Sequence, residues 1–169
     1  MKRLLIGTFV IVLAVGLGGC KSVSEKIGEE IVGGVIGGDV DVSEDEVTIQ
    51  TDEGDVTIAG GEGALTEGFP KDCPIYKDST VESSSRFESG EQVQYYATLQ
   101  APDSVGDVHA WYKGEFESEG WSIENDFKMS ADDGETAMLY AKKGDLEASA
   151  TMSQRDGGTE IVLVVLEAK

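Results

Sequence analysis

Cysteine and positive charge are both scarce in this sequence. Its 169 residues include two cysteines, and 13 Lys and Arg stand against 33 Asp and Glu, which gives a formal net charge of −20 at pH 7. Two cysteines cannot build a framework of several disulfides, so stability must come from a hydrophobic core. Without clustered Lys and Arg the chain cannot neutralise a row of phosphates, which excludes nucleic-acid binding.

Catalytic signatures are missing as well. His109 is the single histidine, no GxSxG is present, and no Gly-Lys-Ser/Thr or GxGxxG opens a helix after a strand. Cys73 and His109 could in principle form a thiolate and base pair. However, helical spacing places His109 beside Phe116 on the flank of an apolar helix face, which favours a structural histidine. The sequence therefore predicts a protein that is not an enzyme and has no cofactor.

The N-terminus has the layout of an export signal. Lys2 and Arg3 precede residues 4–17, an apolar run without charge. This run is shorter than the roughly 20 residues that a membrane-spanning helix needs, and glycines interrupt it. The pattern indicates a signal peptide over residues 1–19, and a permanent membrane helix is not favoured.

A lipid-attachment motif follows the apolar run. The junction resembles the lipobox of bacterial lipoproteins, in which an aliphatic residue and two small residues precede an obligatory cysteine, here Leu17, Gly18, Gly19 and Cys20. The resemblance implies that Cys20 becomes the acylated first residue of the mature protein and attaches it to the lipid bilayer. Lys21 replaces the Asp that retains such proteins at the inner membrane. In a cell with two membranes, the implied location is the outer membrane, facing the periplasm.

Removal of the signal sharpens two features of the composition. The mature chain carries 11 basic and 33 acidic side chains, a net charge of −22, because residues 1–19 contain two basic and no acidic residues. High negative charge favours solubility and opposes self-association. Lipidation of Cys20 leaves Cys73 as the one free thiol.

Three short segments are predicted before the main domain. Apolar residues at helical spacing predict a short amphipathic helix within residues 20–38, which ends at paired glycines. Residues 39–59 alternate apolar and polar positions on both sides of a turn and predict an acidic β-hairpin. Alone a hairpin is marginal, so we expect it to pack on the preceding helix or to extend another sheet. Residues 60–68 are Gly-rich and predict a flexible linker.

The acidic hairpin also raises the question of metal binding. Carboxylates are the oxygen ligands that Ca²⁺ prefers, and five acidic residues gather at Asp39, Asp41, Glu44, Asp45 and Glu46. The run lacks the glycine that an EF-hand loop needs at its sixth position. A solvated acidic hairpin without a metal is therefore the favoured interpretation.

Residues 69–169 predict an α+β domain. A helix over 103–119 opens with a capping-box-like Ser104 and Asp107 and stops at Gly120. Val105, Val108, Tyr112 and Phe116 share one face, so the helix should cover the apolar side of a sheet. Short turns separate the strand candidates, which predicts a mostly antiparallel sheet covered by one main helix. The candidates are residues 80–87, 92–100, 121–128, 136–142, 146–153 and 160–166.

Two segments of this domain carry a further resemblance. The chain resembles uncharacterised bacterial envelope lipoproteins that combine an FPxDxPIY segment, here FPKDCPIY at 69–76, with a helix ending in Gly-Trp, here FESEGW at 116–121. This resemblance implies architecture and location but no activity. The helix followed by a strand is also faintly similar to helix-grip modules of lipoproteins in outer-membrane assembly machinery.

The aromatic residues supply the candidate binding surface, although in a domain of this size they are expected first in the core. Trp111, Tyr112 and Trp121 cluster around the end of the helix and could contact a partner or a ligand. The favoured hypothesis is a membrane-anchored envelope lipoprotein whose domain binds an envelope protein or a cell-wall partner. The alternatives are a carrier of a small apolar ligand between sheet and helix, and an accessory of outer-membrane assembly.

Overall fold

The computed structural model describes residues 39–43, 46–51, 54–59, 63–131 and 134–168. The predicted signal peptide, lipobox and amphipathic helix lie outside these residues. The same holds for Glu44 and Asp45 of the acidic segment.

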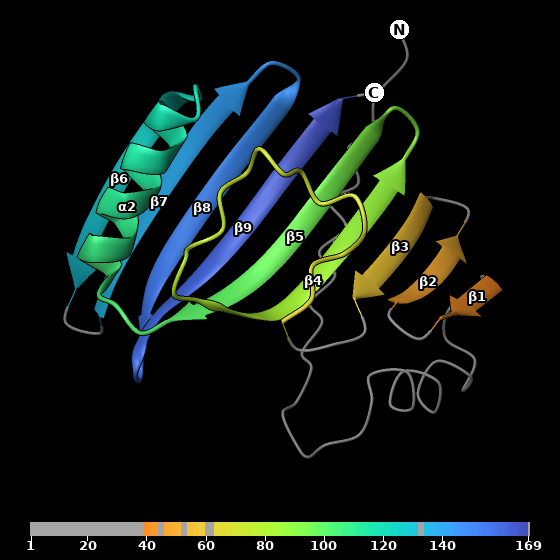
Figure 1. The fold of residues 1–169 in the computed structure, drawn as a ribbon, viewed down its shortest axis with the longest axis horizontal. Coiled ribbons are helices and arrows are strands. Elements are labelled where there is room, and N and C mark those ends of the chain that lie inside the picture. Colours follow the sequence, from red (N-terminus) through yellow and green to blue (C-terminus); the bar gives the residue numbers. More distant parts are fainter. Residues whose placement is uncertain (1–38, 44–45, 52–53, 60–62, 132–133, 169) are drawn as a thin grey trace, which may run out of the picture.

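Strands make up most of the described chain, and one long helix interrupts them (Figure 1). The strands are β1 (Asp39–Val42), β2 (Glu46–Thr51), β3 (Gly54–Ala59), β4 (Thr80–Ser89), β5 (Gln92–Ala101), β6 (Ser122–Ala131), β7 (Gly134–Lys143), β8 (Leu146–Arg155) and β9 (Gly158–Ala168), and the helix is α2 (Val105–Ser118).

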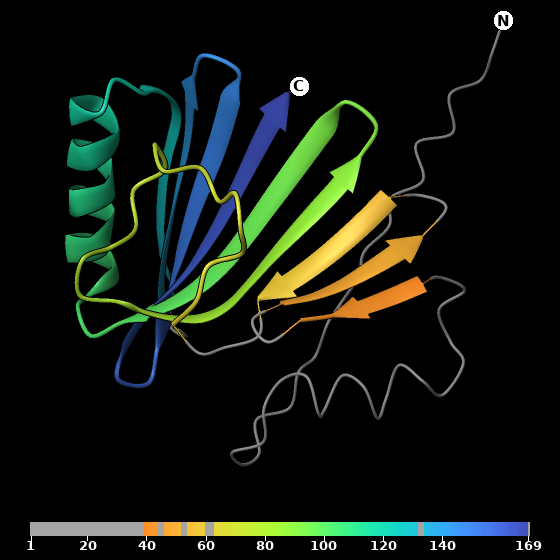
Figure 2. The ribbon, with the colours of Figure 1, turned by 45° about the vertical axis from the view of Figure 1, so that its right-hand side comes forward.

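The described strands form a single sheet in the order β1-β2-β3-β4-β5-β9-β8-β7-β6. Every neighbouring pair is antiparallel. Helix α2 packs on one face of the sheet over β6 to β9. Residues 63–79, here called the covering segment, cross the same face beside the helix (Figure 2). We call the opposite face of the sheet the far face.

The predicted α+β architecture is confirmed. One main helix covers a mostly antiparallel sheet, and each of the six strand candidates in residues 80–166 is present within a few residues of its predicted bounds. The Ser104 hydroxyl caps the helix by accepting a hydrogen bond from the Asp107 amide at 3.2 Å. Gly120 takes a positive φ of 83° just after the helix, as the stop signal predicts.

The core lies between α2, the covering segment and the inner face of the sheet. The four predicted helix residues Val105, Val108, Tyr112 and Phe116 are all buried. Along β9 the side chains alternate, so that Ile161 and its second neighbours face the core with no exposed area. The intervening residues of β9 point to the far face and are half-buried. Every second side chain of β9 therefore belongs to the core.

The sheet continues across the predicted boundary between the acidic segment and the main domain. Within residues 39–59, β2 and β3 pair antiparallel and β1 adds a further strand. Strand β3 in turn pairs with β4 over residues 55–58. This segment thus extends the domain's own sheet.

The described part of the predicted linker, residues 63–68, is also packed on the domain. The Gly63 amide donates to the Val81 carbonyl at 2.9 Å. The buried Thr66 amide donates to Ser84 Oγ at 3.1 Å. These residues begin the covering segment, and they are held to β4 by hydrogen bonds.

Candidate functional site

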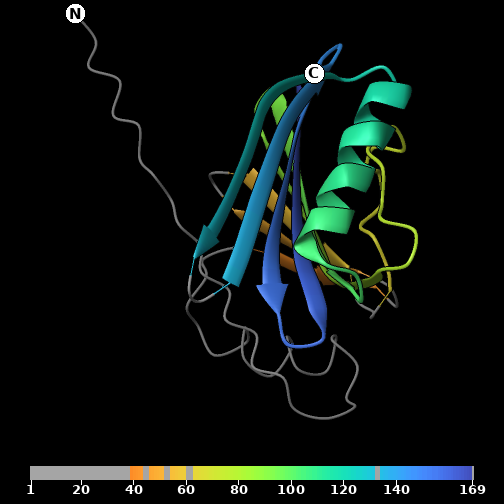
Figure 3. The same ribbon diagram turned by 90° about the vertical axis from the view of Figure 1, so that its left-hand side faces the viewer.

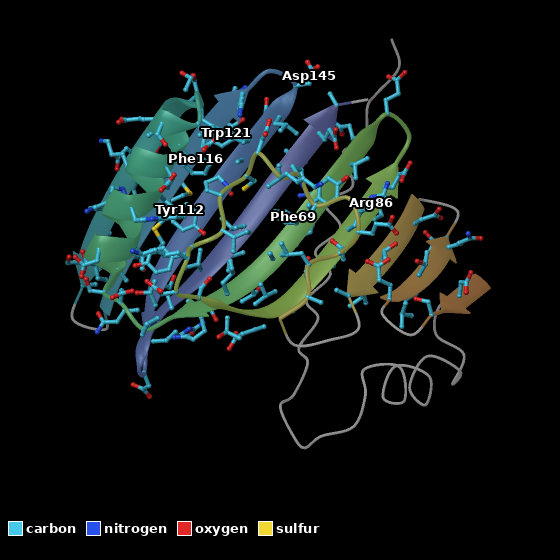
Figure 4. The ribbon with its side chains drawn as sticks, viewed as in Figure 1. Phe69, Arg86, Tyr112, Phe116, Trp121 and Asp145 are labelled. Carbon is cyan, nitrogen blue, oxygen red and sulfur yellow. The ribbon has the colours of Figure 1, made fainter. Side chains whose placement is uncertain are left out.

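Aromatic rings fill the space between helix and sheet. Phe116 packs against Tyr112 and Trp121, with ring centroids 5.8 and 5.3 Å away (Figure 4). Trp111 packs edge to face on both Tyr76 and Tyr112, with ring centroids 4.9 Å away in each case. Tyr112 and Phe116 have no exposed area. The centre of the domain is therefore a closed core in the described residues.

The covering segment explains why this core is closed. Phe69 stacks edge to face on Tyr95 of β5 with centroids 5.8 Å apart. Tyr76 donates its hydroxyl to Asp103 Oδ2 at 2.8 Å, and burial with this acceptor raises its pKa to about 12. The Asp72 carbonyl accepts a hydrogen bond from Trp121 Nε1 at 2.9 Å. Residues of FPKDCPIY thus fasten the segment to both the helix and the sheet.

This packing favours the core over a binding surface for the three candidate aromatic residues. Tyr112 and Trp121 are 0% and 4% exposed, so neither can contact a partner in this structure. Trp111 is partly buried, because Tyr76 of the covering segment packs on it. The three aromatic residues belong to the core and its edge.

Cys73 and His109, considered above as a thiolate and base pair, have other roles in the structure. Cys73 is 3% exposed, and burial raises the pKa of its thiol to about 12, which keeps it protonated and unreactive. His109 is buried on α2, and its Nε2 lies 2.8 Å from Asp126 Oδ1 on β6. The histidine thus joins the helix to an edge strand, as a structural histidine would.

A recess of about 380 Å³ lies at one end of the sheet. It is lined by residues 68 and 70–72 of the covering segment, 145–146 of the β7–β8 turn, and 167–168 of β9. Asp72, Asp145 and Glu167 bring three carboxylates to it, while Lys143 pairs with Asp72 at 3.2 Å. Such a lining does not suit an apolar ligand.

A group of exposed apolar side chains lies on the far face of the sheet, beside its β6 edge. Phe127 and Met129 of β6 are 48% and 52% exposed, and Met138 of β7 is 36% exposed. Phe127 is the direct cross-strand partner of Met138. Their neighbour Asp126 contacts α2, so the alternation along β6 directs Phe127 and Met129 to the far face. We call these three residues the edge patch.

The predicted surface did not include the edge patch, although the sequence carried a signal for it. Within the strand candidate 121–128, the apolar Phe127 alternates with the charged Asp126 and Lys128. Alternation predicts that the charged and apolar residues face opposite sides. It does not tell which side the helix covers, and here α2 lies over the charged side through Lys113 and His109.

Two further features concern membranes and metals. No helix within the described ranges has the length and hydropathy needed to cross a membrane. Among the same residues, no group of three or more His, Cys, Asp or Glu side chains is placed to hold a metal ion.

Comparison with known proteins gives one partial match. A family model described as START domain-like matches residues 81–158, which is less than half of the chain and extends from β4 through α2 to the first residue of β9. No curated protein matches the sequence, and no solved structure matches the fold.

Proposed function

We propose that this protein is a lipid-anchored lipoprotein of the cell envelope whose domain binds another protein through the edge patch. The exposure of Phe127 and Met129 on the edge strand β6, and of Met138 on the neighbouring strand β7, is the observation that carries the binding role. The lipobox pattern at residues 17–20 supports the location. In a cell with two membranes, the absence of Asp after Cys20 favours the outer membrane.

The chemistry of the edge patch favours a protein partner. Phe and Met are enriched in protein interfaces, and a contiguous apolar patch on a strongly charged protein marks an interaction site. The formal net charge of −20 keeps the protein soluble while it exposes these side chains. The edge strand β6 also has unpaired backbone groups, to which an extended segment of the partner can add.

In-cell photocrosslinking tests the binding role. A photoreactive amino acid at Phe127 should capture a discrete protein partner. The same amino acid at Lys128, an exposed neighbour on the other face of β6, should not capture it. Equal capture at both positions, or capture of cell-wall fragments alone, would refute a protein interface at the edge patch. Captured components of outer-membrane assembly would identify the accessory role.

Lipid labelling tests the anchor separately. Cys20→Ala should abolish incorporation of a labelled fatty acid and leave an uncleaved or mislocalised precursor. Normal incorporation in this variant would refute lipidation at Cys20.

A second candidate is a carrier of a small apolar ligand, because the START domain-like match favours a ligand-binding module. The closed aromatic core opposes it, since a carrier needs a cavity of several hundred Å³ and the described recess is lined by carboxylates. Native mass spectrometry of protein purified from cells distinguishes the two. A bound apolar molecule that stays with the protein in the Phe127→Ala variant would favour the carrier.

A further inference from the structure

Apolar side chains extend across the far face well beyond the edge patch. Two cross-strand rows run through β2, β3, β4, β5 and β9, and each contains one polar residue. The rows are Val47, Ile58, Ser85, Tyr96, Val164 and Ile49, Val56, Phe87, Gln94, Leu166. These eight apolar residues form what we call the far-face stripe. We expect a stripe of this size to be covered, because large apolar surfaces rarely remain open to water.

Burial along the stripe is strongest beside the β1 edge. Val47 and Ile49 are only 1% and 6% exposed, whereas Tyr96 on β5 is 38% exposed. Among the described elements, α2 contacts β6 to β9 on the other face, and the covering segment lies on that same side (Figure 3). On an uncovered antiparallel sheet the outward residues face water. Val47 and Ile49 do not, so this end of the stripe has a cover.

We propose that residues 22–36 of the same chain dock as a helix on the far-face stripe. Val23, Ile27, Ile31 and Val35 recur every four residues in this segment and give it one apolar side. Only Gly37 and Gly38 separate it from β1, which pairs with β2 beside Val47 and Ile49. The chain thus enters the sheet at the end of the stripe that is best buried.

The dimensions of helix and stripe agree. Fifteen helical residues at about 1.5 Å each give roughly 22 Å. Five strands spaced about 4.8 Å apart cover roughly 19 Å from the first to the last. A helix whose C-terminal end lies beside β2 can therefore cross the stripe to β9. The edge patch on β6 and β7 stays free for a partner.

The docking has a consequence that rests on the proposed lipid anchor. Cys20 is two residues before the segment. A docked segment brings the lipid to the far face, so the domain is held close to the bilayer in one orientation. The docking itself does not require lipidation, so it can be tested independently of the anchor.

Cysteine crosslinking in the full chain tests the docking. In a Cys73→Ser background, Ile31→Cys combined with Phe87→Cys should form an intramolecular crosslink with a short bismaleimide in cells. Glu29→Cys combined with Phe87→Cys is the matched control, since residue 29 is about 160° around the helix from residue 31. This control should crosslink at least about tenfold less.

Accessibility gives a second readout that does not depend on crosslinking geometry. Phe87→Cys should react slowly with a maleimide, and Ile27→Asp with Ile31→Asp should raise its rate about tenfold by undocking the segment. Lys128→Cys on β6 should react equally in both backgrounds. An unchanged rate at Phe87→Cys, or a crosslinked dimer formed by Phe87→Cys alone, would overturn the proposal; the dimer would assign the stripe to a second copy. Repeating both readouts with Cys20→Ser added removes the Cys20 thiol, so the docking and the lipid anchor fail separately.

Discussion

Asp126 connects the helix to the exposed edge strand through two interactions of one carboxylate. Lys113 Nζ donates to its Oδ2 at 2.7 Å, and His109 Nε2 lies 2.8 Å from its Oδ1. The Lys113 hydrogen bond is the main cause that lowers the pKa of Asp126 below 3.8, and His109 adds to it. These contacts hold the side of β6 that faces α2, so the opposite side presents Phe127 and Met129.

The lowered pKa of Asp126 sets the sign of a pH-dependence prediction. A carboxyl group with a lower pKa in the folded state stabilises the protein above its unfolded pKa, and the stabilisation is lost as the pH falls through the folded value. Asp126→Asn should therefore lower the free energy of unfolding at neutral pH, and the difference from wild type should shrink below about pH 4. Urea melts across this range measure it. A difference that grows below pH 4 would contradict the assignment, and a double-mutant cycle with Lys113→Ala isolates the pair.

Phe116 gives the largest expected single-residue effect on stability. It has no exposed area and contacts two other rings. Phe116→Ala should lower the free energy of unfolding by about 3–5 kcal/mol, the usual range for emptying a buried aromatic site. Trp111→Ala should cost less, because Trp111 is only partly buried. Denaturant melts compare the two, and equal losses would show that Trp111 is as much a core residue as Phe116.

Cys73 should be inert in the folded protein. With a pKa of about 12, its thiol stays protonated at pH 8, and the side chain is out of reach of a reagent. In a Cys20→Ser chain, a maleimide should label Cys73 only after denaturation. Ser122→Cys, at an exposed position on β6, should react in the native protein as a positive control. Rapid native labelling of Cys73 would show that the covering segment opens.

The sequence predicted the residues of the helix better than those of the surface. Helical spacing identified the four buried residues of α2, because amphipathicity is a local pattern. For Trp111, Tyr112 and Trp121 as a group it left both core and binding surface open, because nothing local shows that Tyr76 and the Asp72 carbonyl pack there from some 35 to 49 residues away. Spacing finds an apolar side chain, but only tertiary contacts decide whether it is core or surface.

Among the elements, strands 80–166 were predictable because short turns connect most of them. The pairing of β3 with β4 was not, since about 20 residues separate these strands in the sequence. Gly54 is where β3 begins and approaches the end of β4. It has a φ of 143°, and a Cβ there would lie 2.2 Å from the Glu88 carbonyl oxygen.

Gly54→Ala should therefore weaken the junction between β3 and β4. The clash is with backbone, which cannot move aside as a flexible side chain could. Gly90→Ala in the β4–β5 turn is the control, because its φ of 60° also disfavours alanine but its Cβ would meet nothing within 4 Å. The control should cost about 1–2 kcal/mol. Gly54→Ala should cost more and should speed amide exchange in β3, and equal effects of the two variants would mean that β3 does not depend on this close approach.

At the scale of the whole molecule, one sheet has two faces with different neighbours. The inner face carries the core cluster, covered by α2 and residues 63–79. The far face carries the stripe near β2 and the edge patch near β6. Local patterns predicted the class of the fold, but they could not show that residues 39–59 and the domain share one sheet, because strand pairing between distant segments is not a local property.

The shared sheet leads to a prediction about which part of the chain folds alone. The buried core cluster lies entirely within residues 69–165, so a chain beginning at Phe69 should still unfold cooperatively. It loses the β3 pairing along β4 and the hydrogen bond from the Thr66 amide to Ser84, which is 2% exposed in the full structure. We expect its free energy of unfolding to be lower by roughly 1–3 kcal/mol than that of a chain beginning at Asp39, because buried polar groups near Ser84 lose a partner. Its urea dependence should also be shallower, since less surface becomes exposed on unfolding.

Denaturant melts of the two chains measure both quantities. If only the longer chain unfolds cooperatively, then β1 to β3 are part of the folding unit, and the boundary at residue 69 is wrong.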